Sequence, residues 1–270
     1  MFSYFRKRRR SKLRRQPFPK AWLKIIQANV PVFLRMPKDA QVELLEHVQV
    51  FLHEKRFEGC GGLDITDEIR VTIAAQACIL LVYRDSRYFP KLRSILVYPS
   101  TYVTKAASWS EDGTLTEEAS HRLGESWGTG SVVLSWNASE GGAASPNDGN
   151  NVVFHEFAHQ LDQEDGQADG APILGKRLTR NKRRSMYASW ARIMQSEFDQ
   201  LQDLVVRGKN SLIDDYGATN PAEFFAVATE TFFEKPRLLR KRHAEVYQQL
   251  QEYYCQDPAS WQRAPQDKED

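Results

Sequence analysis

The sequence predicts an α+β fold that is mainly helical and forms a single body with a small mixed sheet. Several segments carry apolar residues at helical spacing, and short β-rich runs lie between them. Neither an internal repeat nor a long linker divides the chain of 270 residues, and 41% hydrophobic residues are enough for a sizeable core. We expect a helical N-terminal part over about residues 18–93 and a second part over about 94–270.

The first 17 residues are expected to form a basic, disordered arm in front of one domain over 18–270. A segment this charged and this poor in large aliphatic residues cannot bury enough surface to fold alone. No apolar region of adequate length follows before Pro17, so the arm does not predict a signal peptide. No run of about 18 apolar residues predicts a membrane span. The basic residues of the arm are Arg6, Lys7, Arg8, Arg9, Arg10, Lys12, Arg14 and Arg15.

The overall composition argues against several classes of partner. The formal net charge is only +2 at pH 7, so the chain as a whole gives no reason to expect a polyanion. Nucleic-acid binding is not expected, because neither interleaved aromatic residues nor a nucleic-acid fold accompanies the arm. Cys60, Cys78 and Cys255 form no CxxC pair. This usage is typical of a reducing compartment and predicts a cytoplasmic location.

Helical spacing predicts the first elements after the arm. Asp39–Phe57 and Ile69–Val82 carry apolar residues three or four positions apart. A β-rich run follows at Ser94–Tyr98. Ala106–Gly130 is polar and contains glycine, which indicates an irregular hairpin or loop before the next strand at Ser131–Trp136.

The rest of the chain is predicted to be helical apart from its loops. Glu140–Asn151 is a loop by composition, and its asparagines are candidate caps for a helix over Val152–Leu161. Asn220 and the proline after it are typical of a helix start. The helices predicted after that loop cover Ser185–Leu204, Pro221–Phe233 and Ala244–Tyr254.

The helix at Val152–Leu161 carries the pattern His-Glu-x-x-His, formed by His155, Glu156 and His159. Four residues make slightly more than one turn, so both imidazoles leave the same face and can bind one ion. Zinc is the expected metal, with His155 and His159 as ligands. Glu156 follows the first ligand and is placed beside the ion, as a general base requires.

Two histidines leave the metal site incomplete, because a catalytic zinc ion takes three protein ligands. The position six residues after His159 holds Asp165 instead of a third histidine. Glu223 and Glu230 are two helical turns apart on one face, and spacing alone divides the ligand role evenly between them. Glu223 also stands three residues after Asn220, where a glutamate commonly completes a capping box.

Four stretches of the chain resemble the Mlc titration factor A family of bacterial zinc peptidases. This family is similar in its catalytic part to the anthrax lethal factor protease. The resemblance covers most of the chain beyond the arm. The matching stretches are LVYPSTYV at Leu96–Val103, GESWGTGSVVLSW at Gly124–Trp136, NVVFHEFAHQLD at Asn151–Asp162 and DDYGATNPAEFFAVATETFF at Asp214–Phe233.

The resemblance implies roles for individual residues. Glu223 becomes the third ligand of one zinc ion per chain, and Tyr216 becomes a hydrogen-bond donor to the oxyanion formed during hydrolysis. Glu230 then becomes the acceptor for the second N–H of a ligand histidine, and Asp162 competes for this role. The implied fold is zincin-like (gluzincin), with the strand at Ser131–Trp136 on the sheet edge beside the active-site cleft, where a peptide substrate adds as a strand.

The resemblance leaves two functions open. One is a zinc-dependent peptidase of aminopeptidase type that acts on small substrates, and the other is a regulatory factor that sequesters an Mlc-like transcriptional repressor of sugar uptake. A residue that recognises a free amino terminus cannot be identified from the sequence, so exopeptidase and endopeptidase modes both stay open.

Overall fold

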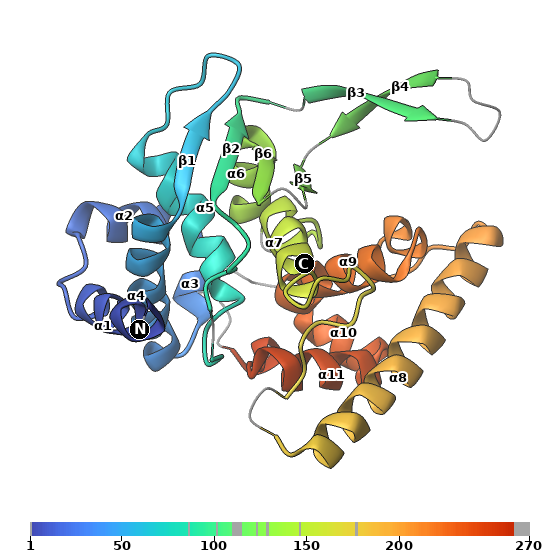
Figure 1. The fold of residues 1–270 in the computed structure, drawn as a ribbon. Coiled ribbons are helices and arrows are strands. Elements are labelled where there is room, and N and C mark those ends of the chain that lie inside the picture. The colour runs from blue at the N-terminus through green and yellow to red at the C-terminus, as the bar shows by residue number, and fades with distance from the viewer. Residues whose placement is uncertain are drawn as a thin grey trace, which may run out of the picture.

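The structure is a computed structural model, and it describes residues 2–85, 87–100, 102–109, 115–122, 124–127, 130–145, 147–175 and 178–261 (Figure 1). Only the backbone is described for residues 2–3, 102–109, 115–122 and 124–127. The end of the expected domain, residues 262–270, lies outside the described residues, as do 110–114, 123, 128 and 129 of the predicted hairpin region.

A four-stranded mixed sheet has the order β1-β2-β6-β5. β1, β2 and β6 are parallel, whereas β5 runs antiparallel to β6. The prediction of a small mixed sheet in an α+β fold is therefore confirmed. In β2 the buried residues Ile95 and Val97 alternate with half-buried ones, as expected for a strand. The bounds are Arg56–Gly59 for β1, Ser94–Tyr98 for β2, Gly124–Trp127 for β5 and Ser131–Ser135 for β6.

The prediction that the strand at 131–136 lies on the sheet edge is wrong. β6 is hydrogen-bonded to β2 on one side and to β5 on the other, so both of its edges are occupied. The edge strand on this side of the sheet is β5. The polar region before β6 also contains a separate antiparallel hairpin of β3 (Tyr102–Trp109) and β4 (Leu115–Arg122), which extends away from the body (Figure 1).

The N-terminal half contains five helices among the described residues. Two of them, α4 and α5, match the predicted segments to within three residues at each end. Thr66 caps α5 by accepting a hydrogen bond from the N–H of Ile69. The bounds are Phe2–Arg14 for α1, Lys20–Asn29 for α2, Val32–Arg35 for α3, Lys38–Glu54 for α4 and Asp67–Ile79 for α5.

The expectation of a disordered arm is wrong for residues 2–14, which form α1. Arg10 donates two hydrogen bonds to the carboxylate of Glu54 on α4, at 2.8 and 2.7 Å. Arg14 donates to the phenol oxygen of Tyr88 at 2.7 Å. The composition argument treated the segment in isolation, whereas these tertiary partners stabilise charged residues that cannot build a core of their own.

The C-terminal half is almost entirely helical. α6 extends into the segment that was predicted to be a loop, because Ser135 accepts from the N–H of Ala138 and starts a helix directly after β6. The seven-residue α10 was not predicted. The bounds are Trp136–Ala144 for α6, Val152–Asp162 for α7, Arg180–Val206 for α8, Pro221–Glu234 for α9, Pro236–Arg242 for α10 and Ala244–Tyr254 for α11, with short 3₁₀ helices at Asp215–Ala218 (η1) and Pro258–Ser260 (η2).

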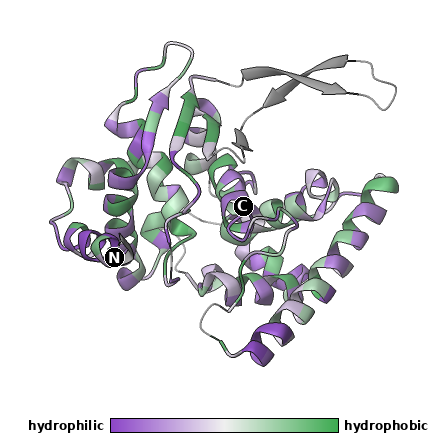
Figure 2. Cartoon of the chain, in the orientation of Figure 1, coloured by the Kyte–Doolittle hydropathy of each residue, from purple (hydrophilic) through white to green (hydrophobic). Residues whose placement is uncertain are grey.

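Helix α7 lies in the middle of the molecule and contacts both the sheet and α9 (Figure 1). The ring of Phe157 packs against Phe51 and Phe89 from the N-terminal half, with centroids 5.7 and 4.8 Å away. Phe154 packs against Phe233 of α9 at 5.2 Å. These contacts hold α7 between the two halves of the core. In Figure 2 the hydrophobic residues are concentrated in the central elements, whereas α1 and the start of α8 are hydrophilic.

Within the described residues, no helix has the length and apolar character needed to cross a membrane.

Candidate metal centre

The histidine helix starts where the sequence predicts. Asn151 is the N-cap of α7, and its side-chain oxygen accepts from the N–H of Phe154 at 3.0 Å. Val153, Phe157 and Ala158 are fully buried and fix one side of the helix in the core. His155 and His159 therefore leave the opposite side together, with their side chains only 14% and 11% exposed.

Three side-chain atoms converge at this point. His155 Nε2 lies 3.0 Å from Glu223 Oε2, and His159 Nε2 lies 3.2 Å from the same oxygen. The two Nε2 atoms are 3.2 Å apart. α7 supplies the imidazoles and α9 supplies the carboxylate, so residues more than sixty positions apart in the chain form one cluster.

The dimensions of this triangle fit a metal ion. Ligand atoms about 2.0–2.1 Å from a tetrahedral zinc ion are about 3.3 Å from one another. The three observed separations are close to this value, and two imidazole nitrogens with one carboxylate oxygen form a typical zinc donor set. Hydrogen bonding alone does not explain the triangle, because it leaves the two Nε2 atoms facing each other at contact distance. His155, His159 and Glu223 could therefore hold a metal ion at this point.

Helix α9 separates the roles of its two glutamates. Asn220 caps α9 by accepting from the backbone N–H of Glu223 at 3.0 Å, while the carboxylate of Glu223 points to the histidines. Glu223 is therefore part of the cap through its backbone only. Glu230, two turns later, accepts from His155 Nδ1 at 2.8 Å and from the backbone N–H of Asn151 at 2.5 Å. Glu230 thus lies on the far side of the same imidazole and orients both the ring and the start of α7.

The carboxylates determine the charge of this cluster. Burial disfavours the imidazolium, but hydrogen bonds to Glu223 and Glu230 outweigh burial and raise the pKa of His155 to about 10. Burial also opposes ionisation of Glu223, but the two histidines outweigh it and lower the pKa of that carboxyl to about 2. Without a metal, the protein therefore compensates the negative charge of Glu223 with a proton on His155. A cation bound at the triangle would take the place of that proton.

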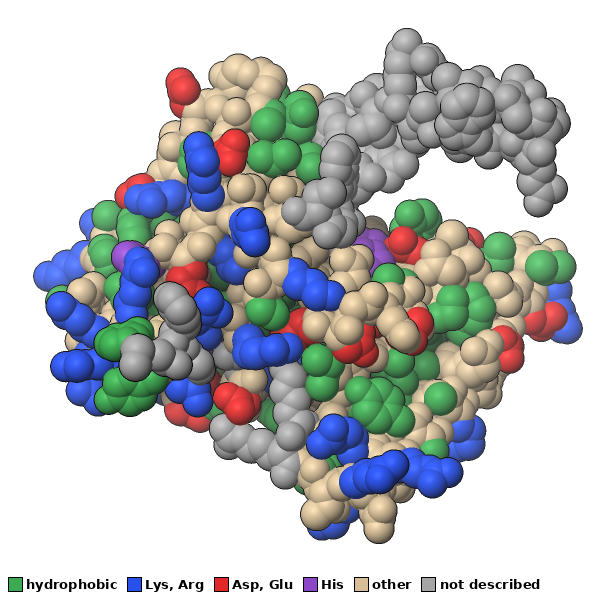
Figure 3. All heavy atoms as spheres, viewed as in Figure 1, with side chains coloured by type: hydrophobic (Ala, Val, Ile, Leu, Met, Phe, Trp, Pro, Cys, Tyr) green, Lys and Arg blue, Asp and Glu red, His purple; other side chains and the backbone are tan. Residues whose placement is uncertain are grey.

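The other predicted site residues lie at different depths. Glu156 is 4% exposed and follows the first histidine on α7. Tyr216 lies in η1, where Asp214 accepts from its backbone N–H. The residue is 56% exposed, and the centroid of its ring is 5.9 Å from that of His155. The phenol is thus beside the cluster on its solvent side. Figure 3 shows a histidine side chain reaching the surface near the middle of this face, with acidic side chains beside it.

Asp162 has a different position from Glu230. It is fully buried, and Oδ2 accepts from the backbone N–H of Gly170 at 3.0 Å. Burial raises the pKa of Asp162 to about 7. Gly170 has a positive φ of 75°, and a Cβ atom there would lie 2.3 Å from the carbonyl oxygen of Pro221. Asp162 therefore anchors the loop after α7 against the first turn of α9, and Glu230 is the acidic residue that contacts His155.

Sequence reasoning missed Glu234, which lies one turn beyond Glu230. Its Oε1 accepts from the side-chain N–H of Asn151 at 3.1 Å, so two glutamates of α9 hold the cap residue of the histidine helix. A signal was present, because positions 223, 230 and 234 share one face of an otherwise apolar helix. Burial raises the pKa of Glu234 to about 8, although the hydrogen bond from Asn151 opposes the rise.

We expect Glu234→Gln to make the stability of the metal-free protein less dependent on pH. The carboxyl has a pKa of about 4.3 in the unfolded chain, so between there and about pH 8 the folded protein binds more protons. Titration of Glu234 therefore lowers the free energy of unfolding as the pH rises through this window, by an amount on the order of a few kcal/mol. At lower pH the carboxyl is protonated in both states, and this loss is absent. Glutamine retains the acceptor for Asn151 but does not titrate.

Urea denaturation with a chelator present, at several pH values across this window, measures the effect. Glu140→Gln provides a matched control, because Glu140 is exposed on α6. The same pH slope in wild type and Glu234→Gln would contradict the prediction.

Comparison with known proteins agrees with this geometry. Residues 4–255 match the family described as glucose-regulated metallo-peptidase M90. An uncharacterised protein of Synechocystis sp. is 40% identical over 251 residues, which cover 93% of this chain and 89% of that protein. Mlc titration factor A of Yersinia pestis is 30% identical over 234 residues, which cover 85% of this chain and 83% of that protein. The chain belongs to the M90 family of glucose-regulated metallo-peptidases.

Proposed function

We propose that the protein is a zinc-dependent peptidase of aminopeptidase type whose metal is held by His155, His159 and Glu223. The observation that carries the proposal is the triangle of three ligand atoms with separations of 3.0 to 3.2 Å. When bound there, zinc would act as a Lewis acid that lowers the pKa of water and polarises a substrate carbonyl. Membership of a metallo-peptidase family supports the same reaction class.

Three residues of the chain have separate roles in the proposed reaction. Glu156 takes a proton from the attacking water and delivers it to the leaving amine, since it follows a ligand on the same helix turn. The phenol of Tyr216 donates a hydrogen bond to the oxygen of the substrate carbonyl as negative charge develops on it. Glu230 holds the His155 ring in one orientation through Nδ1, which leaves Nε2 available as a ligand.

The sheet edge offers a place for an extended substrate. β5 pairs with β6 on one side, and the described residues include no strand on its other side. β5 also contacts α7, the helix of the histidines. We propose that a peptide pairs with the outer edge of β5 by main-chain hydrogen bonds. We therefore infer that β5 carries the substrate-binding edge, because β6 is an interior strand.

Hydrolysis of an amino-acid p-nitroanilide tests the proposal. The purified protein is expected to release p-nitroaniline, to lose this activity when dialysed against a chelator, and to recover it when zinc is added back. Magnesium, which prefers oxygen ligands, provides the control ion and should not restore activity. Activity that is unaffected by removal of all bound metal would contradict the proposal.

A second candidate function is regulatory binding of a protein. The name of the Yersinia relative, Mlc titration factor A, supports this candidate. A protein that works by sequestering a transcriptional repressor should bind this partner equally well as wild type and as Glu156→Gln, because the substitution preserves shape and metal ligands. A pull-down with the purified repressor measures this binding. The cytoplasmic location expected from the cysteines stays a prediction and is required by this second function.

A further inference from the structure

We propose that the pocket between α1, the end of α4 and the loop at 87–92 is a binding site for a phosphate-bearing ligand. The pocket has a volume of about 480 Å³, which is in the usual range for small-molecule sites. It is formed by three separate segments of the chain and lies away from the histidine cluster. Its lining includes Arg6, Arg9 and Arg10 of α1, Lys55 after α4, and Arg87 of the loop.

Positive charge dominates the pocket. The five basic residues of the lining are accompanied there by a single acidic residue, Glu54. Glu54 is already engaged by Arg10 in a two-bond ion pair, and Arg87 pairs with Glu164, outside the lining, at 3.3 Å, so Arg6, Arg9 and Lys55 carry the excess charge. Arg9 donates a hydrogen bond to Nε2 of His53. This neutral partner does not compensate the charge of Arg9. An anion would balance this excess, and guanidinium groups match the geometry of phosphate oxygens.

Figure 3 shows Lys and Arg side chains gathered on the side of the molecule where α1 and α4 lie. On α1, Arg6, Arg9 and Arg10 are three and four positions apart, so they share the face that lines the pocket. Arg8 belongs to the other side of this helix and does not line the pocket. The helix therefore supplies a cationic wall of the pocket. It also supplies Arg8 as a control residue that lies outside the pocket.

The buried ammonium of Lys55 fixes the opposite wall. Its Nζ donates to the carbonyl oxygens of Phe89 and Leu92, both at 2.7 Å. Burial is the main reason that the pKa of Lys55 is lowered to about 8; the charge of Glu54 opposes this shift, and the charges of Arg10 and Arg6 contribute to it. The cations of the pocket thus repel one another, which an anion would relieve.

The loop is held in a strained conformation. Tyr88 and Phe89 have φ values of 59° and 50°, in the left-handed region that bulky residues rarely adopt. Such a backbone conformation is energetically unfavourable, and residues of this kind cluster at ligand sites. His47 holds the Tyr88 phenol at 2.8 Å, and the Phe89 ring is buried against Phe157. The fold therefore retains an unfavourable backbone where the pocket is formed.

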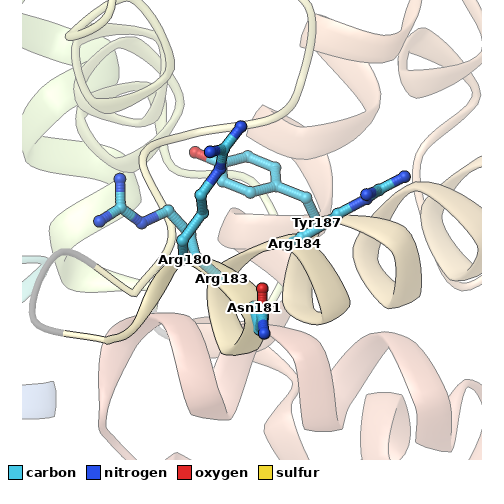
Figure 4. Close-up of a pocket in the computed structure, with 5 residues that line it drawn as sticks. All are labelled: Arg180, Asn181, Arg183, Arg184 and Tyr187. Atoms are coloured by element: carbon cyan, nitrogen blue, oxygen red, sulfur yellow. The ribbon is translucent and has the colours of Figure 1, made fainter.

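A second pocket is also lined by arginines, but it differs from the pocket at α1 in two respects. It lies at the start of α8 and is lined by Arg180, Asn181, Arg183, Arg184 and Tyr187 (Figure 4). All of its residues come from one helix, and the labelled guanidinium groups point apart. The pocket at α1 is instead lined from three segments, and it includes the apolar side chains of Phe5, Pro90 and Leu92. These apolar residues can contact the organic part of a phosphorylated compound.

Glycerol 3-phosphate is a suitable probe, with glycerol as the uncharged control. We expect calorimetry of the full chain to show saturable one-to-one binding of the phosphate compound and no binding of glycerol. Arg6→Glu should weaken binding by about tenfold or more, since it removes a charged partner. Arg8→Glu makes the same change in net charge outside the pocket and should alter the affinity by no more than about twofold.

Arg87→Gln tests the second wall and should also weaken binding about tenfold. Equal losses in Arg6→Glu and Arg8→Glu, or no loss in Arg87→Gln, would overturn the proposal, because binding would then reflect only the basic surface of α1. No binding of the phosphate compound at all, or binding of an oligonucleotide in its place, would overturn it too.

Vesicles of phosphatidylcholine, with and without phosphatidylglycerol, separate the two sources of such a ligand. Sedimentation with the anionic vesicles that is lost in Arg6→Glu but kept in Arg8→Glu supports a lipid headgroup. One-to-one binding of glycerol 3-phosphate without sedimentation supports a soluble phosphorylated compound. These measurements record binding and not hydrolysis, so their outcome is independent of the proposed metal site.

Discussion

Replacing Glu156 by glutamine is expected to lower the rate of peptide hydrolysis by about 10²–10⁴-fold, which is the usual contribution of a general base. Glutamine has nearly the same shape as glutamate but cannot accept a proton at neutral pH. Glu156 is not one of the three residues whose atoms converge. The zinc content per chain is therefore expected to equal that of wild type, and the defect should appear in kcat.

Steady-state kinetics on an amino-acid p-nitroanilide, together with metal analysis of the same preparations, measures both parts of this expectation. Glu140→Gln makes the same chemical change at an exposed position of α6 and should leave both values unchanged. A Glu156→Gln protein that hydrolyses the substrate at the wild-type rate would remove Glu156 from the reaction. A variant that loses its metal would instead indicate that Glu156 supports the site structurally.

Replacing Glu223 by alanine is expected to abolish stoichiometric zinc binding. Only two imidazoles would remain at the triangle, and catalytic zinc sites have three protein ligands. His155→Ala should have the same effect. Glu230→Ala should be milder and weaken zinc affinity by about 10–100-fold, because it removes the acceptor for Nδ1 and leaves all three ligand atoms in place.

Metal analysis after dialysis, followed by competition with a chromogenic chelator, ranks these variants. Circular dichroism shows whether each variant has folded. Loss of zinc in Glu230→Ala together with full occupancy in Glu223→Ala would reverse the assignment of the two glutamates. Full occupancy in all three variants would place the metal elsewhere in the protein.

Local sequence signals predicted those elements that are stabilised mainly within themselves. The caps at Asn151 and Asn220 and the apolar residues of α7 and α9 predicted both helices to within one residue at each end. β2 and α11 have the predicted bounds. Helix α1 was missed, because its arginines depend on Glu54 and Tyr88, which are distant in the chain. Strand β5 was missed because four residues in a polar segment carry little periodicity.

By itself, the sequence determined that His155 and His159 share one face of a capped helix and that Glu156 stands between them. It also placed Glu223 and Glu230 on one face of a second helix, but spacing within a helix says nothing about where another helix crosses it. The family resemblance implied which glutamate is the ligand, but the physical reason is the packing of α7 on α9, which brings Glu223 to Nε2 of His155 and Glu230 to Nδ1. The two glutamates are chemically identical, so their difference comes from which side of the imidazole each one reaches.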